Sequence, residues 1–252
     1  MAITTVSLGV LVLAAFVPAI VWMALLRNTG RHGREPVRRV VQAFLWGAVV
    51  GVIVAIILSL LVIALLLPRI GPAYEFLGDR GFSDPITLIT VCLVAPFVEE
   101  FAKALGVLRV RKFIDEPEDG LVYGGSAGLG FAATENVLYG LVLLSESLEA
   151  SLLLVAIRSV SSALLHATAT ASTGYGLARA KVWGGTAIPF FLLAVLLHGS
   201  FNFLASVGEQ LSGTYGDAAA VIGLLGAIVF GVLGFVLIRR KIREKDLGWR
   251  PS

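Results

Sequence analysis

Long runs of apolar residues dominate the chain, and charged residues are gathered between them. The run at residues 40–67 carries no charged side chain at all. A helix needs about 20 apolar residues to cross the hydrocarbon core of a bilayer. Only helices and closed barrels satisfy their backbone groups there, and runs of this length favour helices. The pattern predicts an all-α, polytopic transmembrane bundle of about seven spans, at residues 3–26, 40–67, 86–108, 120–144, 151–178, 186–207 and 217–238.

Composition agrees with this prediction. Of the 252 residues, 57% are hydrophobic and only 15% are charged, whereas soluble domains have about a quarter charged. Cys92 is the only cysteine, which excludes an intrachain disulfide and a thiolate metal cluster. Residues 3–26 lack the basic region that begins a cleaved signal peptide, so we expect a retained first helix.

Positive charge is distributed unevenly between the two sides of the predicted bundle. Sixteen of the 20 Lys and Arg follow spans one, three, five and seven, and only Arg69 and Arg80 lie in the other connections. Because cytoplasmic loops are enriched in Lys and Arg, we expect the N-terminus outside and the C-terminus in the cytoplasm. The basic tail at residues 239–252 is expected to contact anionic lipid headgroups rather than nucleic acid.

Several polar residues interrupt the apolar spans. Each charge at a membrane centre costs roughly 3 kcal/mol on insertion scales, so these side chains should face one another inside the bundle. Glu99, Glu135, His166 and His198 lie near the middle of four consecutive spans, which predicts one polar layer near the midplane. The ionisable residues within the spans are Glu99, Glu100, Lys103, Glu135, Arg158, His166 and His198.

Helical spacing groups these residues further. Lys103 is three and four residues from Glu100 and Glu99, so it can pair with either carboxylate. His198 and Asn202 share one helix face, as do Glu135 with Tyr139 and His166 with Thr170. Pro96 precedes the glutamates and is expected to kink its helix, opening room for water beside Glu99.

Two kinds of hydrolytic site could be built from this set. A carboxylate and an imidazole can deprotonate a water, while a second His with an Asn amide holds the oxyanion. Alternatively, Glu99, His166 and His198 could bind Zn²⁺ with one open position, although no HExxH motif is present. The spacing of His198 and Asn202 favours the metal-free form, because Asn is a poor zinc ligand. A zinc ion would neutralise several carboxylates that lie at one depth, which favours the metal-bound form.

Structural interpretations compete with each feature taken singly. A Glu–Lys pair or a lone intramembrane His often only joins helices. The glycine-rich stretch at residues 123–133 is typical of close helix packing. It includes a G-x-S-x-G match centred on Ser126, which we assign to packing because no strand–turn–helix context surrounds it.

The stretches FVEEFAK, GLGFAATENVLYG, RSVSSALLHATATASTGYG and HGSFN together resemble the motif series of the PrsW family of intramembrane proteases. That family is related to the CAAX prenyl protease and bacteriocin-processing superfamily. The resemblance runs from about Glu99 to Asn202. It implies cleavage of a membrane protein, in some relatives an anti-sigma factor. Lys103 stands where the wider superfamily often has Arg one position later, which departs from the prenyl-protein branch and suits the PrsW branch.

Roles follow from the resemblance. Glu99 corresponds to the water-activating base, with Glu100 beside it, while His166, His198 and Asn202 correspond to the later catalytic motifs. Glu135, Asn136 and Tyr139 belong to the family's pattern as supporting positions. Apart from the resemblance, Lys103 is expected to orient or neutralise the site, and Arg158, nearer the outer surface, to pair with a carboxylate or guide substrate.

We therefore expect residues 1–252 to form one integral-membrane peptidase domain of the cell membrane, with its catalytic motifs at residues 95–205. Expected partners are the lipid bilayer and a membrane-protein or peptide substrate, with Zn²⁺ or no cofactor. The sequence names no particular substrate and no oligomeric state.

The alternative is a proton-coupled transporter or channel that uses the Glu, His and Lys cluster as a relay. Such a relay should continue to both faces, whereas a protease needs one cluster and a lateral opening. A non-catalytic scaffold is disfavoured by the buried carboxylates.

Overall fold

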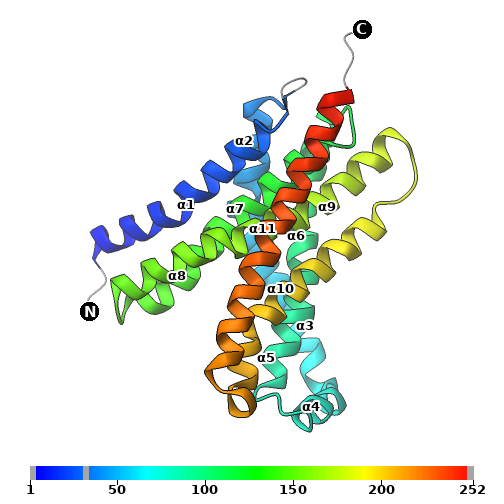
Figure 1. Cartoon of the computed structure of the whole chain (residues 1–252). Coiled ribbons are helices and arrows are strands. Elements are labelled where there is room, and N and C mark those ends of the chain that lie inside the picture. Colours follow the sequence, from blue (N-terminus) through cyan, green and yellow to red (C-terminus); the bar gives the residue numbers. More distant parts are fainter. Residues whose placement is uncertain (1–3, 31–33, 249–252) are drawn as a thin grey trace.

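The protein is a bundle of long helices (Figure 1). The computed structural model describes residues 4–30 and 34–248, and no strand occurs in these ranges. Seven helices or helix pairs in them are long and apolar enough to cross a membrane, as the sequence predicted. These segments are Thr5–Arg27, Val37–Arg69, Pro85–Phe113, Asp119–Leu144, Leu148–Val182, Ile188–Gly208 and Asp217–Glu244.

Four of these spans lie within single helices, and the other three contain several elements. The elements are α1 (Thr5–Arg27), α2 (Val37–Leu45), η1 (Trp46–Gly51), α3 (Val52–Leu66), η2 (Leu67–Arg69), α4 (Gly71–Gly78), α5 (Pro85–Ile89), η3 (Thr90–Val94), α6 (Ala95–Val110), η4 (Arg111–Phe113), α7 (Asp119–Leu144), α8 (Leu148–Val160), α9 (Ser162–Val182), α10 (Ile188–Tyr215) and α11 (Asp217–Gly248). The elements η1 and η3 are π-helical, whereas η2 and η4 are 3₁₀ turns.

Helix α7 occupies the centre of the bundle and packs most closely against α9. Small residues permit the close approach. A Cβ added at Gly128 would lie 2.2 Å from the carbonyl oxygen of His166, and one added at Gly124 would lie 2.3 Å from that of Thr170. The two backbones are therefore in direct contact, as expected for a small-residue helix interface in a membrane. This contact fixes the height and rotation of His166.

The helix that carries the paired glutamates begins irregularly. Proline cannot donate the backbone hydrogen bond that the residue four positions earlier would accept. The π-helical element η3 ends at Val94, two residues before Pro96, so the chain absorbs the missing bond in a widened turn. Gly199 of α10 packs against this turn, because a Cβ there would lie 2.4 Å from the carbonyl oxygen of Cys92. The close contact brings the neighbouring His198 toward α6.

The fifth span is broken between α8 and α9. Ser161 stands at the break with φ −116° and ψ −79°. The hydroxyls of Ser159 and Ser161 donate to carbonyl oxygens four residues earlier, at 2.7 and 2.8 Å. Serine hydroxyls that bond in this way bend helices. The break allows Arg158, near the end of α8, to turn toward the interior.

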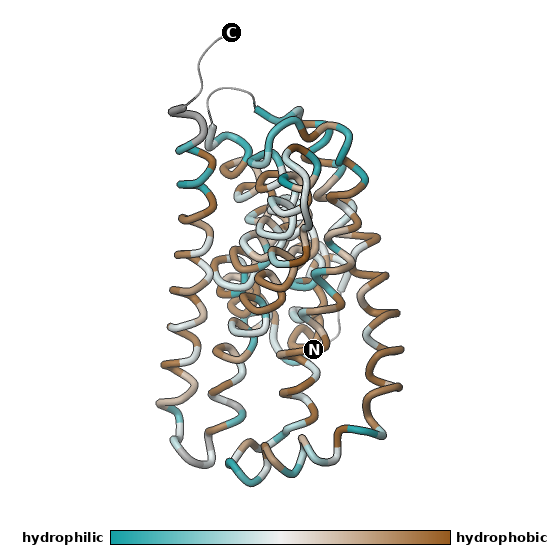
Figure 2. Tube along the Cα trace, turned by 90° about the vertical axis from the view of Figure 1, so that its right-hand side faces the viewer, coloured by the Kyte–Doolittle hydropathy of each residue, from teal (hydrophilic) through white to brown (hydrophobic). Residues whose placement is uncertain are grey.

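Hydrophilic residues gather at the end of the bundle where α11 ends, and apolar stretches run along the helices (Figure 2). Arg31 and Arg250, which belong to the predicted basic side, lie outside the described residues. The short helix α4 is exposed and caps the opposite end. The orientation of the two ends relative to the cytoplasm stays a prediction.

Candidate active site

Four helices bring the predicted polar layer together in the interior of the bundle. Helix α6 contributes two glutamates and a lysine, α7 contributes a glutamate, and α9 and α10 contribute one histidine each. Glu100, Lys103, His166 and His198 are buried, with relative exposures of 0%, 0%, 1% and 1%. The sequence could place these residues at one depth, and the structure places their side chains in contact.

Lys103 is the central cation of the cluster. Its Nζ lies 3.2 Å from Oε2 of Glu99 and 2.9 Å from Oε1 of Glu100. The same Nζ lies 4.2 Å from the centre of the Phe131 ring, a cation–π contact. Because an isolated buried charge is costly, these contacts explain how an ammonium is held inside the bundle.

Both ring nitrogens of His166 have partners. Nδ1 lies 2.7 Å from Nζ of Lys103, and Nε2 lies 2.8 Å from Oε2 of Glu135. An ammonium is only a donor, so Nδ1 accepts and the proton resides on Nε2, which donates to Glu135. This pair of contacts fixes the tautomer and the ring plane of His166.

His198 is oriented by the second glutamate of α6. Its Nδ1 lies 3.1 Å from Oε1 of Glu100, and the other oxygen of Glu100 accepts a 2.9 Å hydrogen bond from Thr170. Donation from Nδ1 leaves the Nε2 lone pair free, and Nε2 lies 3.8 Å from Oε2 of Glu99. The rings of His166 and His198 meet edge to face, with their centres 4.6 Å apart.

Arg158 joins the cluster from α8. One of its terminal nitrogens, Nη2, lies 2.9 Å from Oε2 of Glu135, and its Nε donates to Oδ1 of Asn136 at 2.8 Å. The guanidinium also stacks on Tyr139, 3.8 Å from the ring centre. Glu135 therefore connects Arg158 to His166, and all the supporting residues expected on α7 contact this arginine or this glutamate.

Asn202 makes its hydrogen bond to the backbone of a neighbouring element. It shares a face of α10 with His198, but its Nδ2 donates to the carbonyl oxygen of Val91 at 2.8 Å. Val91 belongs to the π-helical element η3, where backbone bonding is irregular. The amide thus fastens α10 to η3, and its catalytic role stays a prediction.

A groove between α3 and α7 leads to the cluster. It has a volume of about 240 Å³, and its two ionisable lining residues are Glu99 and Glu135. Their side chains are 13% and 18% exposed, so these are the carboxylates that solvent or a ligand can reach. Ile56 and Leu60 of α3 line the groove and are themselves largely exposed on the apolar surface. The opening therefore faces sideways, toward the hydrocarbon region.

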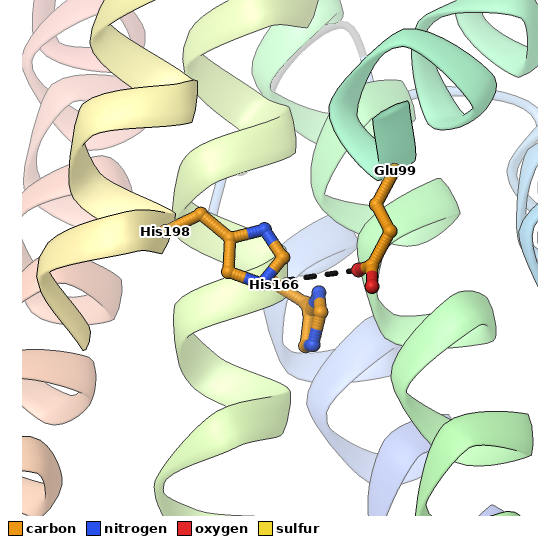
Figure 3. A group of neighbouring side chains, drawn as sticks. All are labelled: Glu99, His166 and His198. Atoms are coloured by element: carbon orange, nitrogen blue, oxygen red, sulfur yellow. Dashed lines mark ion pairs between the residues drawn. The ribbon is translucent and has the colours of Figure 1, made fainter. Parts of the chain in front are cut away.

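The residues present fit a metal ion. Glu99, His166 and His198 each offer one donor atom, and the three atoms lie within 4.8 Å of one another (Figure 3). Two imidazoles and one carboxylate form a donor set known from catalytic zinc sites. A carboxylate that orients the far nitrogen of a metal-binding histidine is also typical of such sites, and Glu100 holds His198 in this way. The cluster has three carboxylates and two permanent cations, which leaves negative charge that a metal ion would offset.

Two residues that contact the site, Phe131 and Thr170, were not predicted from the sequence as parts of it. Phe131 touches the Lys103 ammonium, and its ring centre lies 5.6 Å from that of His166. It is four residues before Glu135, so a shared helix face was the available signal. Thr170 was placed on the face of His166, but its bond to Glu100 could not be read from spacing. Ser126 is fully buried and donates to the carbonyl oxygen of Val122, in agreement with a packing role.

Comparisons with known proteins agree with the resemblance seen in the motifs. A sequence model described as PrsW family intramembrane metalloprotease matches residues 35–238. Protease PrsW of Clostridioides difficile (strain 630) is 30% identical over 206 residues, which cover 78% of this chain and 79% of that protein. Protease PrsW of Geobacillus kaustophilus is 28% identical over 211 residues, covering 79% and 81%. Protease PrsW of Bacillus subtilis (strain 168) is 26% identical over 200 residues, covering 76% and 80%. No solved structure matches the chain at a significant level.

Proposed function

The chain belongs to the PrsW family of intramembrane metalloproteases, and we propose that its Glu and His cluster hydrolyses a peptide bond of a membrane-protein substrate. It is a multi-pass integral protein of the cell membrane and a protease. One observation carries the assignment of the site. The Glu99 carboxylate, beside two buried histidines, lies at the inner end of a groove that opens sideways between α3 and α7.

The groove gives the substrate a route to the site from within the membrane. Its walls on α3 are apolar apart from Ser59, and a lipid-facing segment of a substrate would keep its side chains in apolar surroundings there. We assign Ser59 to a hydrogen bond with an unwound substrate backbone, since such groups need partners in the hydrocarbon region.

Glu99 acts as the proton acceptor. Its Oε2 faces Lys103 and His198, which leaves Oε1 to take a proton from the attacking water. Glu99 is also the more exposed of the two neighbouring glutamates, because Glu100 is fully buried. Glu99 later returns this proton to the leaving amine.

We assign Zn²⁺ to the donors of Glu99, His166 and His198, in keeping with the family description. A zinc ion supplies Lewis acidity, which makes water more acidic and polarises a carbonyl group. The chain's own residues prepare this position. Glu100 holds His198 with its Nε2 lone pair turned inward, and Glu135 holds His166 from the opposite side.

The remaining charged residues position the site. Lys103 balances the carboxylates of α6, and Arg158 balances Glu135. Asn202 holds α10 against η3 through the Val91 carbonyl, which keeps His198 at the height of Glu99. We infer that residues 1–252 act as one peptidase domain with the N-terminus outside and the C-terminus in the cytoplasm. An anti-sigma factor is the substrate class that we propose.

The test compares membrane proteins in source cells that express the wild-type chain or the Glu99→Gln variant at equal levels. Mass spectrometry of protein termini should find new termini in or beside membrane spans with the wild type only. His198→Ala should abolish the same termini, and Ser126→Ala should retain them. Identical termini in wild-type and Glu99→Gln cells would remove the assignment of this cluster as the catalytic site.

A further inference from the structure

A second, larger pocket lies away from the catalytic cluster, at the hydrophilic end of the bundle. It has a volume of about 610 Å³ and lies between α2 with η1 on one side and the end of α6 with η4 on the other. Arg39, Arg109 and Lys112 line it, and its lining includes no aspartate or glutamate. The pocket is therefore both positively charged and formed from two separate spans.

Aromatic rings rather than carboxylates hold these three cations. The guanidinium of Arg39 lies 3.6 Å from the centre of the Phe113 ring, and Nζ of Lys112 lies 5.1 Å from the same centre. The Arg109 guanidinium lies 5.1 Å from the ring of Trp46. Among the side chains that the structure describes, no carboxylate forms an ion pair with any of the three. Three like charges around one pocket repel each other, so an anion between them is favoured.

Apart from Gln42, which accepts a 2.8 Å hydrogen bond from Arg39, the rest of the pocket is apolar and continues along the membrane-facing surface. Leu45 and Val49 lie one helical turn apart, and each is 53% exposed. Val50 extends the same wall in η1. A ligand that fills the whole pocket therefore needs an anionic end for the cations and an apolar body for this wall. A free phosphate ion would use only the first part.

We propose that this pocket binds one anionic phospholipid, with its phosphate among Arg39, Arg109 and Lys112 and an acyl chain along Leu45 and Val49. Basic pockets between transmembrane helices recognise anionic headgroups in this manner. The proposal is independent of the catalytic assignment, because none of these residues touches the Glu and His cluster. It concerns one defined site rather than the general attraction of basic loops to the bilayer surface.

The position of Trp46 connects this lipid site to the helix that carries the glutamates. Its indole Nε1 donates to the carbonyl oxygen of Ala102 at 3.1 Å, next to Lys103 in the chain. A Cβ added at Gly106 would lie 2.5 Å from the same indole, so the ring packs directly on α6. A lipid bound against Trp46 would therefore hold α2 and α6 together.

The experiment uses the purified full chain in mild detergent and native mass spectrometry with added phosphatidylglycerol, phosphatidylcholine or inorganic phosphate. We expect one phosphatidylglycerol per chain, binding at least tenfold tighter than phosphatidylcholine, and no displacement by millimolar phosphate. The variant Arg39→Gln/Arg109→Gln/Lys112→Gln should bind phosphatidylglycerol on the order of 100-fold more weakly, since each cation near an anionic lipid contributes about a fivefold factor. The matched control is Arg240→Gln/Lys241→Gln/Arg243→Gln at the exposed end of α11, which should bind as the wild type does.

A second variant guards against loss of folding in the triple substitution. Val49→Trp keeps all three cations and fills the apolar wall, and it should weaken phosphatidylglycerol binding while gel filtration and thermal unfolding match the wild type. Equal weakening in the two triple variants would show that net charge alone attracts lipid. Four outcomes would each overturn the proposed site. They are equal weakening in the two triple variants, equal binding of the two lipids, displacement by phosphate, and unchanged binding in Val49→Trp.

Discussion

Nζ of Lys103 lies 2.7 Å from Nδ1 of His166, and both side chains are closed off from the surface of the bundle. The ammonium therefore occupies one of the two nitrogen positions through which His166 could hold a metal ion. Lys103 also contacts Glu99, so a single cation pairs with two of the three proposed metal ligands when no metal is present. We therefore expect a metal ion to compete with Lys103 for contact with His166.

The first prediction concerns this competition. Lys103→Met removes the cation and leaves buried carboxylates unpaired, which costs about 3–5 kcal/mol of stability in comparable sites. Zinc should restore part of this loss, because a ligand that binds only the folded state stabilises it. We expect zinc to raise the thermal midpoint of Lys103→Met more than that of the wild type. Lys241→Met, on the exposed end of α11, is the control. Equal zinc shifts in all three proteins would contradict the competition.

A second prediction tests Glu99 as the proton acceptor. Glu99→Gln keeps the shape of the side chain and its ability to accept a hydrogen bond from Lys103, but it cannot take a proton. Loss of a general base lowers the rate by about 100-fold or more. We expect that loss in a cleavage assay. Because Glu99 is also a proposed zinc ligand, the thermal midpoint should be close to that of the wild type when both proteins are compared without added metal. Glu244→Gln, which changes an exposed glutamate paired with Arg240, should cleave normally.

Metal removal gives the third prediction. Protein purified without chelators should contain one zinc per chain by elemental analysis, and His198→Ala should contain much less. A membrane-permeable chelator should stop cleavage, and added zinc should restore it. Full activity in protein shown to lack metal would favour a metal-free Glu and His mechanism instead.

The fourth prediction separates packing from chemistry on α7. Ser126→Ala should retain activity, because the Ser126 hydroxyl only bonds back to Val122. Gly128→Ala should lose most activity and stability, because its Cβ would lie 2.2 Å from the His166 carbonyl oxygen. Overpacking of this kind typically costs about 1–3 kcal/mol. Gly9→Ala on α1 is the control, as nothing lies within 4 Å of the added Cβ. Labelling of Ser126 by a fluorophosphonate probe would argue for a serine mechanism.

Topology is tested by thiol labelling in intact cells. In a Cys92→Ser background, a cysteine at Lys112 should be protected from an impermeant reagent, and one at Glu146 should react. Both positions are exposed in the structure, so burial does not decide the result. Reaction at Lys112 together with protection at Glu146 would invert the proposed orientation.

Hydrophobic pattern predicted the spans and the shared depth of the polar residues, because both depend on position along helices that cross a membrane. Contacts that depend on departures from regular helix were not predictable. Arg158 was expected to pair with a carboxylate, but the sequence did not show which one, because its contact with Glu135 depends on the break at Ser161. The π-helical element η3 similarly supplies the carbonyl that accepts from Asn202, a bond that helical spacing within α10 could not show.

The direct contact of the α7 and α9 backbones has a consequence for altering the specificity of this protein. Main-chain contact depends on the absence of side chains, so it persists when apolar residues elsewhere are exchanged. The wall that α3 contributes to the groove, including Ile56, Ser59 and Leu60, takes no part in that contact. Substitutions intended to change substrate preference should therefore begin on α3, because they leave the relative positions of the Glu and His side chains unchanged.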